Sequence, residues 1–93
     1  MSAQETPEAF PAPGVWAVYM LLCGDGSLYT GCTNDFPRRL RQHQNGTGAK
    51  YTRSRAPLRP VYLETVSGRS EALRREFAIK QLSAAEKRHL AGL

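Results

Sequence analysis

Residues 15–32 constrain the fold more than any other part of this chain. Residues 15–23 read VWAVYMLLC, a nearly continuous apolar run that is typical of a strand covered on both faces. The next three residues, Gly24, Asp25 and Gly26, favour a tight turn, and SLYTGC then returns as a second strand. The pattern therefore predicts a largely buried β-hairpin.

The register of this hairpin decides which side chains share a face. If the loop spans residues 24–26, Tyr19 lies opposite Gly31. Tyr19 and Tyr29 then project to the same side of the sheet as diagonal neighbours. Because Gly31 has no side chain, we expect open space directly opposite Tyr19.

A helix is predicted directly after the hairpin, with Asn34 or Asp35 as a suitable N-cap and residues 45–46, Asn-Gly, as a suitable end. At 3.6 residues per turn, Phe36, Leu40 and His43 form its inner stripe. Arg39 lies beside this stripe and faces the sheet, whereas the adjacent arginine points to solvent.

The second half of the chain predicts a loop, a strand and two helices. Residues 46–60 show no periodicity and form a basic loop, and residues 60–66 read as a third strand with Val61 and Leu63 on one face. The two helices cover residues 71–82, capped by Ser70, and residues 84–90, capped by Ser83. The apolar stripe of the longer helix consists of Ala72, Leu73, Phe77 and Ile79.

These elements predict one small α/β (α+β) domain over residues 15–93, a sheet with helices packed on it. Residues 1–14 contain three prolines and no apolar periodicity, so we expect a flexible or weakly docked tail. A chain of 93 residues builds no deep pocket, which favours a large substrate held at the surface.

The charge of the chain indicates the class of binding partner, and its cysteine content indicates the cellular compartment. The net charge of +5 and pI near 9.7 favour a polyanionic partner, although many small domains are basic for solubility alone. Two cysteines are too few for a disulfide framework, which favours the cytoplasm. We expect neither a signal peptide nor a membrane span, because no apolar run is long enough.

Glu76 is the most unusual residue of the predicted helix over residues 71–82. It lies amid apolar residues, where an unpaired carboxylate is unfavourable. Either Lys80, one turn later, forms an ion pair with it, or the carboxylate binds a divalent cation.

Arg39 and His43 each allow a structural and a chemical interpretation. Arg39 either pairs with Glu64 or another carboxylate, or binds a phosphate through its planar guanidinium. His43 is either a packed core residue or a group that transfers protons or orients a phosphate.

The two tyrosines and the basic loop also allow both a structural and a functional interpretation. Strand tyrosines are usually structural, and a phenol becomes a useful base where a cation such as Arg39 lowers its pKa. The basic loop is either a solvated surface or a surface that contacts nucleic acid through Lys50, Tyr51, Arg53 and Arg55. Taken together, these residues favour metal-assisted attack of water on a phosphodiester.

The same residues resemble those of the GIY-YIG nucleases. The two signatures correspond to residues 17–19, Ala-Val-Tyr, and 29–31, Tyr-Thr-Gly, followed by Arg39 and His43 on the helix. Residues 72–76 resemble the family's metal-binding glutamate segment. Residues 48–53 and 60–64 are similar to the small standalone YhbQ-like (UPF0213) branch, although Ala17, Val18 and Cys32 depart from the residues of other relatives.

This resemblance implies a three-stranded antiparallel sheet flanked by helices. It also implies hydrolysis of DNA phosphodiester bonds with one Mg²⁺ or Mn²⁺ ion held by Glu76. Tyr19 would activate water, helped by Tyr29 or His43, and Arg39 would stabilise the pentavalent phosphate. Larger relatives carry a separate DNA-binding domain, so we expect binding through the module itself, a protein partner or a homodimer.

We therefore predict a metal-dependent endonuclease that cuts DNA in repair or recombination. The sequence leaves open whether the target is branched, single-stranded or duplex DNA, or RNA. The alternative is a non-catalytic nucleic-acid-binding module of the same fold. The predicted catalytic residues are Tyr19, Tyr29, Arg39, His43 and Glu76, and the predicted nucleic-acid contacts are Lys50, Tyr51, Arg53 and Arg55.

Overall fold

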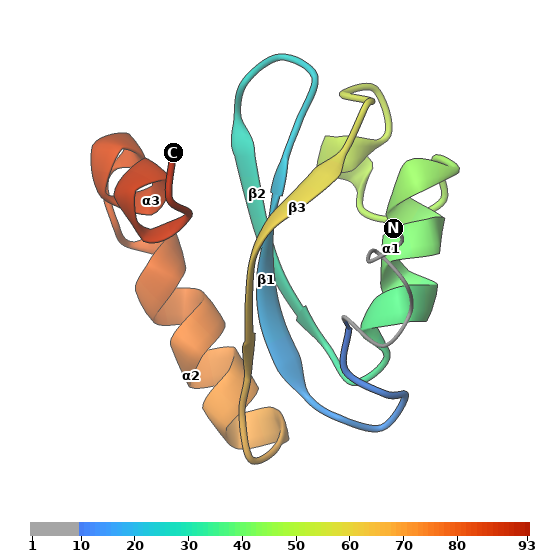
Figure 1. Ribbon diagram of the computed structural model, residues 1–93, viewed down its shortest axis with the longest axis vertical. Helices are drawn as coiled ribbons and strands as arrows, with labels where there is room; N and C mark the ends of the chain where they lie inside the picture. Colours follow the sequence, from blue (N-terminus) through green and yellow to red (C-terminus); the bar gives the residue numbers. More distant parts are fainter. Residues whose placement is uncertain (1–9) are drawn as a thin grey trace, which may run out of the picture.

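The computed structural model describes residues 10–93, which form a three-stranded antiparallel sheet with helices on both faces (Figure 1). The predicted α+β fold is therefore confirmed. The strands are β1 (Ala17–Leu22), β2 (Leu28–Thr33) and β3 (Arg59–Thr65), in the order β2-β1-β3. The helices are α1 (Phe36–Gln44), the short 3-10 helix η2 (Lys50–Thr52), α2 (Arg69–Lys80) and α3 (Ala84–Leu90). Among residues 10–93, none of these helices is long and apolar enough to cross a membrane.

The hairpin adopts the register that the sequence predicts. Tyr19 pairs with Gly31, and the Cys23 N–H group donates to the Ser27 carbonyl at 2.9 Å. Gly26 has a φ of 87°, a left-handed conformation that favours glycine at this position of the turn. Tyr19 and Tyr29 consequently lie on the same face of the sheet.

The alternation of side chains along β1 divides the core into two layers. Odd-numbered residues face α1, and even-numbered residues face α2 and α3, which lie on the opposite side of the sheet (Figure 1). The first layer contains Tyr19, Leu21, Phe36 and Leu40. The second layer contains Val18, Met20, Ala72 and Ile79.

Helix α1 begins and packs as predicted. The Asp35 carboxylate accepts a hydrogen bond from the Arg38 N–H group at 3.2 Å and thereby caps the helix. Phe36, Leu40 and His43 are buried against the sheet, which confirms the inner stripe.

Helix α2 differs from its prediction in two respects. Its N-cap is Gly68 rather than Ser70. Ala72 and Ile79 are fully buried, but Leu73 and Phe77 are 43% and 67% exposed, so the predicted stripe was wrong. Residues 72, 76 and 79 share a face at about 100° per residue, and Leu73 and Phe77 lie outside it because they are rotated by about 100° and 140°.

The basic loop and β3 also differ from the expected pattern. The loop contains η2, whose Thr52 is buried. Strand β3 is irregular opposite Met20 and Leu21, where a bulge leaves Val61 without a partner on β1. Val61 therefore packs in the α2 layer, whereas Leu63 packs in the α1 layer, and the shared face predicted for these two residues was wrong.

The chain that leads into β1 contacts the domain from Phe10 onward. The Phe10 ring packs edge-on against Phe36, with 5.1 Å between the ring centroids. The Gly14 N–H group donates to the Asn34 carbonyl at 2.6 Å. The first nine residues of the predicted tail lie outside the described residues.

Candidate active site

A buried hydrogen bond joins the two strongest candidates of the α1 layer. The Tyr19 hydroxyl lies 2.9 Å from Nε2 of His43, and both residues are 1% exposed. On the other side of the ring, His43 Nδ1 lies 2.9 Å from the Thr52 hydroxyl, which itself donates to the Ala49 carbonyl at 3.0 Å. Since that hydroxyl proton is already used, Nδ1 is the protonated nitrogen and Nε2 accepts from Tyr19.

Two glycines make this packing possible. A β-carbon at Gly48 would lie 2.6 Å from His43 Nδ1, so the loop can pass the imidazole this closely because it carries glycine. At Gly31 a β-carbon would lie 2.6 Å from the Tyr19 hydroxyl oxygen. The open space expected opposite Tyr19 is therefore filled by the tyrosine's own side chain, and that expectation was wrong.

Burial keeps both members of the pair neutral at physiological pH. Burial, together with the nearby Tyr29, raises the pKa of Tyr19, although a hydrogen bond and the charge of Arg39 oppose this rise. Burial and the Arg39 charge lower the pKa of His43 to about 4. Arg39 lowers the Tyr19 pKa, as the sequence suggests, but desolvation is the larger effect and the net pKa is raised.

Arg39 lies next to this pair and hydrogen-bonds Tyr19. It is partly buried, whereas Arg38 is exposed, as the helix geometry predicts. Its Nη1 group donates to the Gln42 side chain at 3.0 Å, and within residues 10–93 it forms no salt bridge. The predicted alternative partner, Glu64, instead binds Nε of Arg75 through both oxygens at 2.8 and 2.9 Å.

Tyr29 extends the aromatic cluster from His43 to the basic loop. Its ring lies 5.2 Å from the His43 ring and stacks on Tyr51 at 5.9 Å between centroids. The Arg55 guanidinium lies 3.9 Å from the centre of the Tyr51 ring and is held by Asp25 at 3.0 Å. Of the predicted nucleic-acid contacts, Tyr51 and Arg55 therefore form internal contacts, and Lys50 and Arg53 are exposed.

Glu76 approaches from the opposite face of the sheet. It lies on α2 and accepts a hydrogen bond from the Cys32 thiol at 3.5 Å, while its other oxygen lies 3.1 Å from Lys80 Nζ. Burial and the neighbouring Glu76 raise the pKa of Cys32 to about 11, so this thiol is neutral. The tyrosines, Arg39 and His43 are thus brought together, and Glu76 is separated from them by the edge strand β2.

Glu76 would hold a divalent ion with few protein ligands. Among the described residues, no group of three or more His, Cys, Asp and Glu side chains lies close enough to bind a metal. Mg²⁺ accepts such a site, because it keeps several waters and takes further oxygens from a substrate phosphate. The Lys80 side chain is 48% exposed and that of Glu76 is 19% exposed, and ion pairs open to solvent are worth about 0–1 kcal/mol, so a divalent cation can displace the lysine.

Comparison with known proteins shows the family of the chain. The sequence profile of the GIY-YIG catalytic domain matches residues 15–89. The chain belongs to the GIY-YIG family. This family is a nuclease family, which implies a nucleic acid as the substrate and, in general, dependence on a divalent metal.

Relatives of the GIY-YIG domain described here are UPF0213 proteins. One from Desulfotalea psychrophila is 54% identical over 76 residues, covering 81% of this chain and 69% of the relative. One from Halobacterium salinarum is 51% identical over 73 residues, covering 78% and 95%. The solution NMR structure of a UPF0213 protein from Bacillus halodurans is 45% identical, covers 84% of this chain and 83% of its own, and has a TM-score of 0.56. These matches confirm the UPF0213 branch.

Three polar features of the GIY-YIG domain were not predicted: two contacts and one buried hydroxyl. Thr52 orients His43, Cys32 hydrogen-bonds Glu76, and Thr30 has a buried hydroxyl without a partner within residues 10–93. The short loop between α1 and η2 contains Gly48, and this glycine was a possible signal for a close approach to the helix. No feature of the sequence indicated Thr30.

Proposed function

We propose that this GIY-YIG domain is a metal-dependent endonuclease that hydrolyses DNA phosphodiester bonds in DNA repair or recombination. The observation that carries the proposal is the hydrogen-bonded chain from Tyr19 through His43 to Thr52, next to an arginine without a carboxylate partner in the described residues. A buried base oriented toward a phenol, beside an arginine that no carboxylate of residues 10–93 pairs with, is suited to proton transfer at a phosphate. We assign the activity to the cytoplasm, where free thiols such as Cys23 and Cys32 persist.

In this proposal Arg39 binds the scissile phosphate and stabilises the charge that develops on it. Tyr19 and His43 are buried in this conformation, so a movement is needed before water reaches the phenol. In this proposal Arg39, which hydrogen-bonds the Tyr19 hydroxyl, turns toward the phosphate and opens that path. The high pKa of Tyr19 excludes a standing phenolate. In the proposed step the water oxygen bonds to phosphorus while the bond from phosphorus to the leaving 3′ oxygen breaks, and that oxygen takes up a proton from solvent. The phenol accepts a proton from the attacking water as its own proton passes to Nε2 of His43, which becomes an imidazolium and keeps its Nδ1–H bond to Thr52.

Tyr29 and Glu76 complete the proposed site from the two faces of β2. Tyr29 is partly exposed and packs against His43, a position from which its hydroxyl can orient the water or the phosphate. Glu76 is the residue that would hold Mg²⁺ or Mn²⁺, after exchange of its Lys80 contact. When bound, the ion supplies Lewis-acid stabilisation of charge on the phosphate.

The second candidate is a non-catalytic nucleic-acid-binding module of the same fold. It is favoured by one observation: both carboxylate oxygens of Glu76 already have protein partners, Cys32 and Lys80. Such a module would bind nucleic acid with a steep salt dependence and cut none of it.

A plasmid-nicking assay separates the two candidates. Supercoiled plasmid is incubated with the protein and Mg²⁺, Mn²⁺ or EDTA, alongside branched, single-stranded and duplex DNA and RNA. We expect metal-dependent nicking that falls by about 10²–10³ in Arg39→Ala. Arg38→Ala, a change of the same charge on the exposed side of α1, should cleave like the wild type. Equal nicking by Arg39→Ala and the wild type would refute the assignment.

A further inference from the structure

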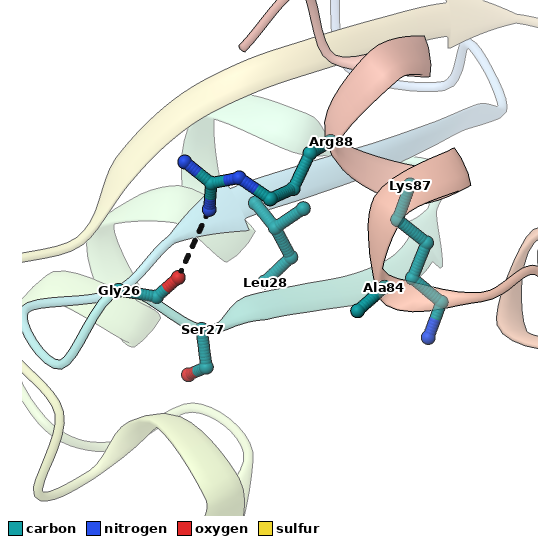
Figure 2. A pocket seen from close by; sticks show the side chains of 6 residues that line it. All are labelled: Gly26, Ser27, Leu28, Ala84, Lys87 and Arg88. Carbon is teal, nitrogen blue, oxygen red and sulfur yellow. Dashed lines mark hydrogen bonds between the residues drawn. The ribbon is translucent and has the colours of Figure 1, made fainter.

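A cationic groove runs along the outer side of the edge strand β2, at the end of the candidate active site. It consists of two cavities of about 260 and 360 Å³ that share Leu28 and Lys87, and we call them together the β2 groove. The first cavity is lined by Gly26, Ser27, Leu28, Ala84, Lys87 and Arg88 (Figure 2). The second is lined by Leu28, Tyr29, Thr30, Tyr51, Lys80 and Lys87.

The charges that line the β2 groove all have the same sign. Lys80, Lys87 and Arg88 contribute three cations, and no Asp or Glu among residues 10–93 lines either cavity. Figure 2 shows that Arg88 reaches from α3 to the Gly26 carbonyl, which it contacts at 3.4 Å. The Lys87 side chain extends past Ala84, and its ammonium group lies apart from the other side chains drawn (Figure 2). Such a surface is suited to an anion.

Thr30 gives the groove a second, independent feature. Its side chain is 4% exposed, it lines the larger cavity, and its hydroxyl has no hydrogen-bond partner among the described residues. Buried hydroxyl groups are almost always paired, because an unpaired one destabilises the fold. A ligand oxygen in the cavity could supply the missing partner if the side chains around the Thr30 hydroxyl moved to admit it.

The groove also adjoins both halves of the candidate active site. Tyr29 lines it and packs against His43 in the α1 layer. Lys80 lines it and pairs with Glu76 on the other side of β2. A chain of phosphates that passes the active site along this strand would therefore continue over Lys80 and Lys87 toward Arg88.

We propose that the β2 groove binds the phosphate backbone of the nucleic-acid strand next to the phosphate that is cut, with Lys87 and the Thr30 hydroxyl as its contacts. This inference rests on the proposed function for the identity of the ligand. It adds a strand-guiding site, built by α3 and the edge strand, that lies outside the catalytic residues. We identify the anion as backbone phosphate, because the groove follows β2 and three cations, Lys80, Lys87 and Arg88, line it.

The test is equilibrium binding in EDTA, where no cleavage occurs. Fluorescence anisotropy of a labelled single-stranded DNA oligonucleotide is measured over a range of salt concentrations with the full chain. Lys87→Ala should weaken binding and reduce the slope of log affinity against log salt by about one contact, roughly 0.7–0.9. Arg74→Ala, which removes one exposed cation from α2 outside the groove, is the matched control. It should change the affinity and the salt slope less than Lys87→Ala does.

Thr30→Val separates a binding role from a structural one, because valine has the same shape and lacks the hydroxyl. We expect the urea midpoint of this variant to rise, since an unpaired buried group is removed, while DNA affinity falls about tenfold. An oligonucleotide with neutral methylphosphonate linkages should lose the effects of both variants. If Thr30→Val binds DNA with unchanged affinity and Lys87→Ala keeps the wild-type salt slope, the groove does not bind the strand. This conclusion would hold even if the chain proves to be a nuclease. If the chain cuts no substrate but both variants show the expected effects on binding, the groove proposal is supported and the nuclease proposal is refuted.

Discussion

The Tyr19 hydroxyl and Nε2 of His43 lie 2.9 Å apart in the core and tie the central strand of the sheet to helix α1. Neither residue is accessible to solvent in this conformation, since each is 1% exposed. Their pKa values move in opposite directions, upward for the phenol and downward for the imidazole, so both are neutral at pH 7. The pair therefore keeps one proton on the Tyr19 hydroxyl, and transfer of that proton to His43 requires that Tyr19 takes up another proton, from the attacking water, in the same step.

Removal of the Tyr19 hydroxyl tests this pair. Tyr19→Phe should lower the cleavage rate by about 10²–10⁴, because the acceptor of the water's proton is lost. Unfolding should become easier by about 1–3 kcal/mol, since His43 Nε2 loses its buried partner. Tyr62→Phe removes a strand hydroxyl outside the site and is the control for rate. A wild-type rate in Tyr19→Phe would limit this residue to a structural role.

Thr52 sets which nitrogen of His43 carries the proton. Thr52→Val removes the acceptor of the Nδ1–H group and should destabilise the fold by about 1–3 kcal/mol. Nitrogen chemical shifts of His43, measured by NMR, should show a protonated Nδ1 in the wild type and a changed tautomer balance in the variant. Thr65→Val, at an exposed position, is the control. A wild-type His43 protonated at Nε2 would contradict the assignment.

The low pKa of His43 predicts a loss of stability in acid. Its pKa is about 4 in the folded state, below the ordinary histidine value of 6.5, so between these values the unfolded chain binds a proton that the folded chain does not. The stabilisation is complete above pH 6.5, declines as pH falls to about 4, and amounts to about 3 kcal/mol. Urea unfolding at neutral pH and at about pH 5 should show a smaller loss in His43→Gln than in the wild type. Equal losses would contradict the shifted pKa.

Lys80 competes with a metal ion for Glu76. Lys80→Met keeps the aliphatic stem and removes the ammonium group 3.1 Å from the carboxylate. Mn²⁺ affinity, measured by calorimetry without DNA, should rise by up to about fivefold, the equivalent of an exposed ion pair. Lys87→Met removes a cation that does not pair with Glu76 and should have a smaller effect. Unchanged or weaker Mn²⁺ binding in Lys80→Met would argue against Glu76 as the metal ligand.

The hairpin and helix α1 were predictable because local patterns determine them. Two glycines around Asp25 set the register that pairs Tyr19 with Gly31, and the 3.6-residue period placed Phe36, Leu40 and His43 inside. The same period placed Arg38 on the exposed side of the helix and Arg39 on the side that faces the sheet. These positions follow from turn chemistry and helix geometry, which act over a few residues.

The other features depend on tertiary contacts. Phe77 was expected in the core, but α2 packs through the small residue Ala72 and through Ile79, which rotates Phe77 into solvent. The contacts of His43 with Thr52 and of Glu76 with Cys32 join separate elements across the chain. Neither follows from spacing, because the loop conformation and the approach of α2 to the edge strand decide them.

The claim that Glu76 holds the metal for chemistry at Arg39 is tested most directly by the Mn²⁺ dependence of plasmid nicking. Glu76→Gln has the same shape and loses the charge, so we predict that it needs far more Mn²⁺ for half-maximal nicking, or does not cut. Arg39→Ala should lower the maximal rate while the Mn²⁺ requirement stays that of the wild type. Nicking by Glu76→Gln at the wild-type rate and with the wild-type Mn²⁺ requirement would contradict the account.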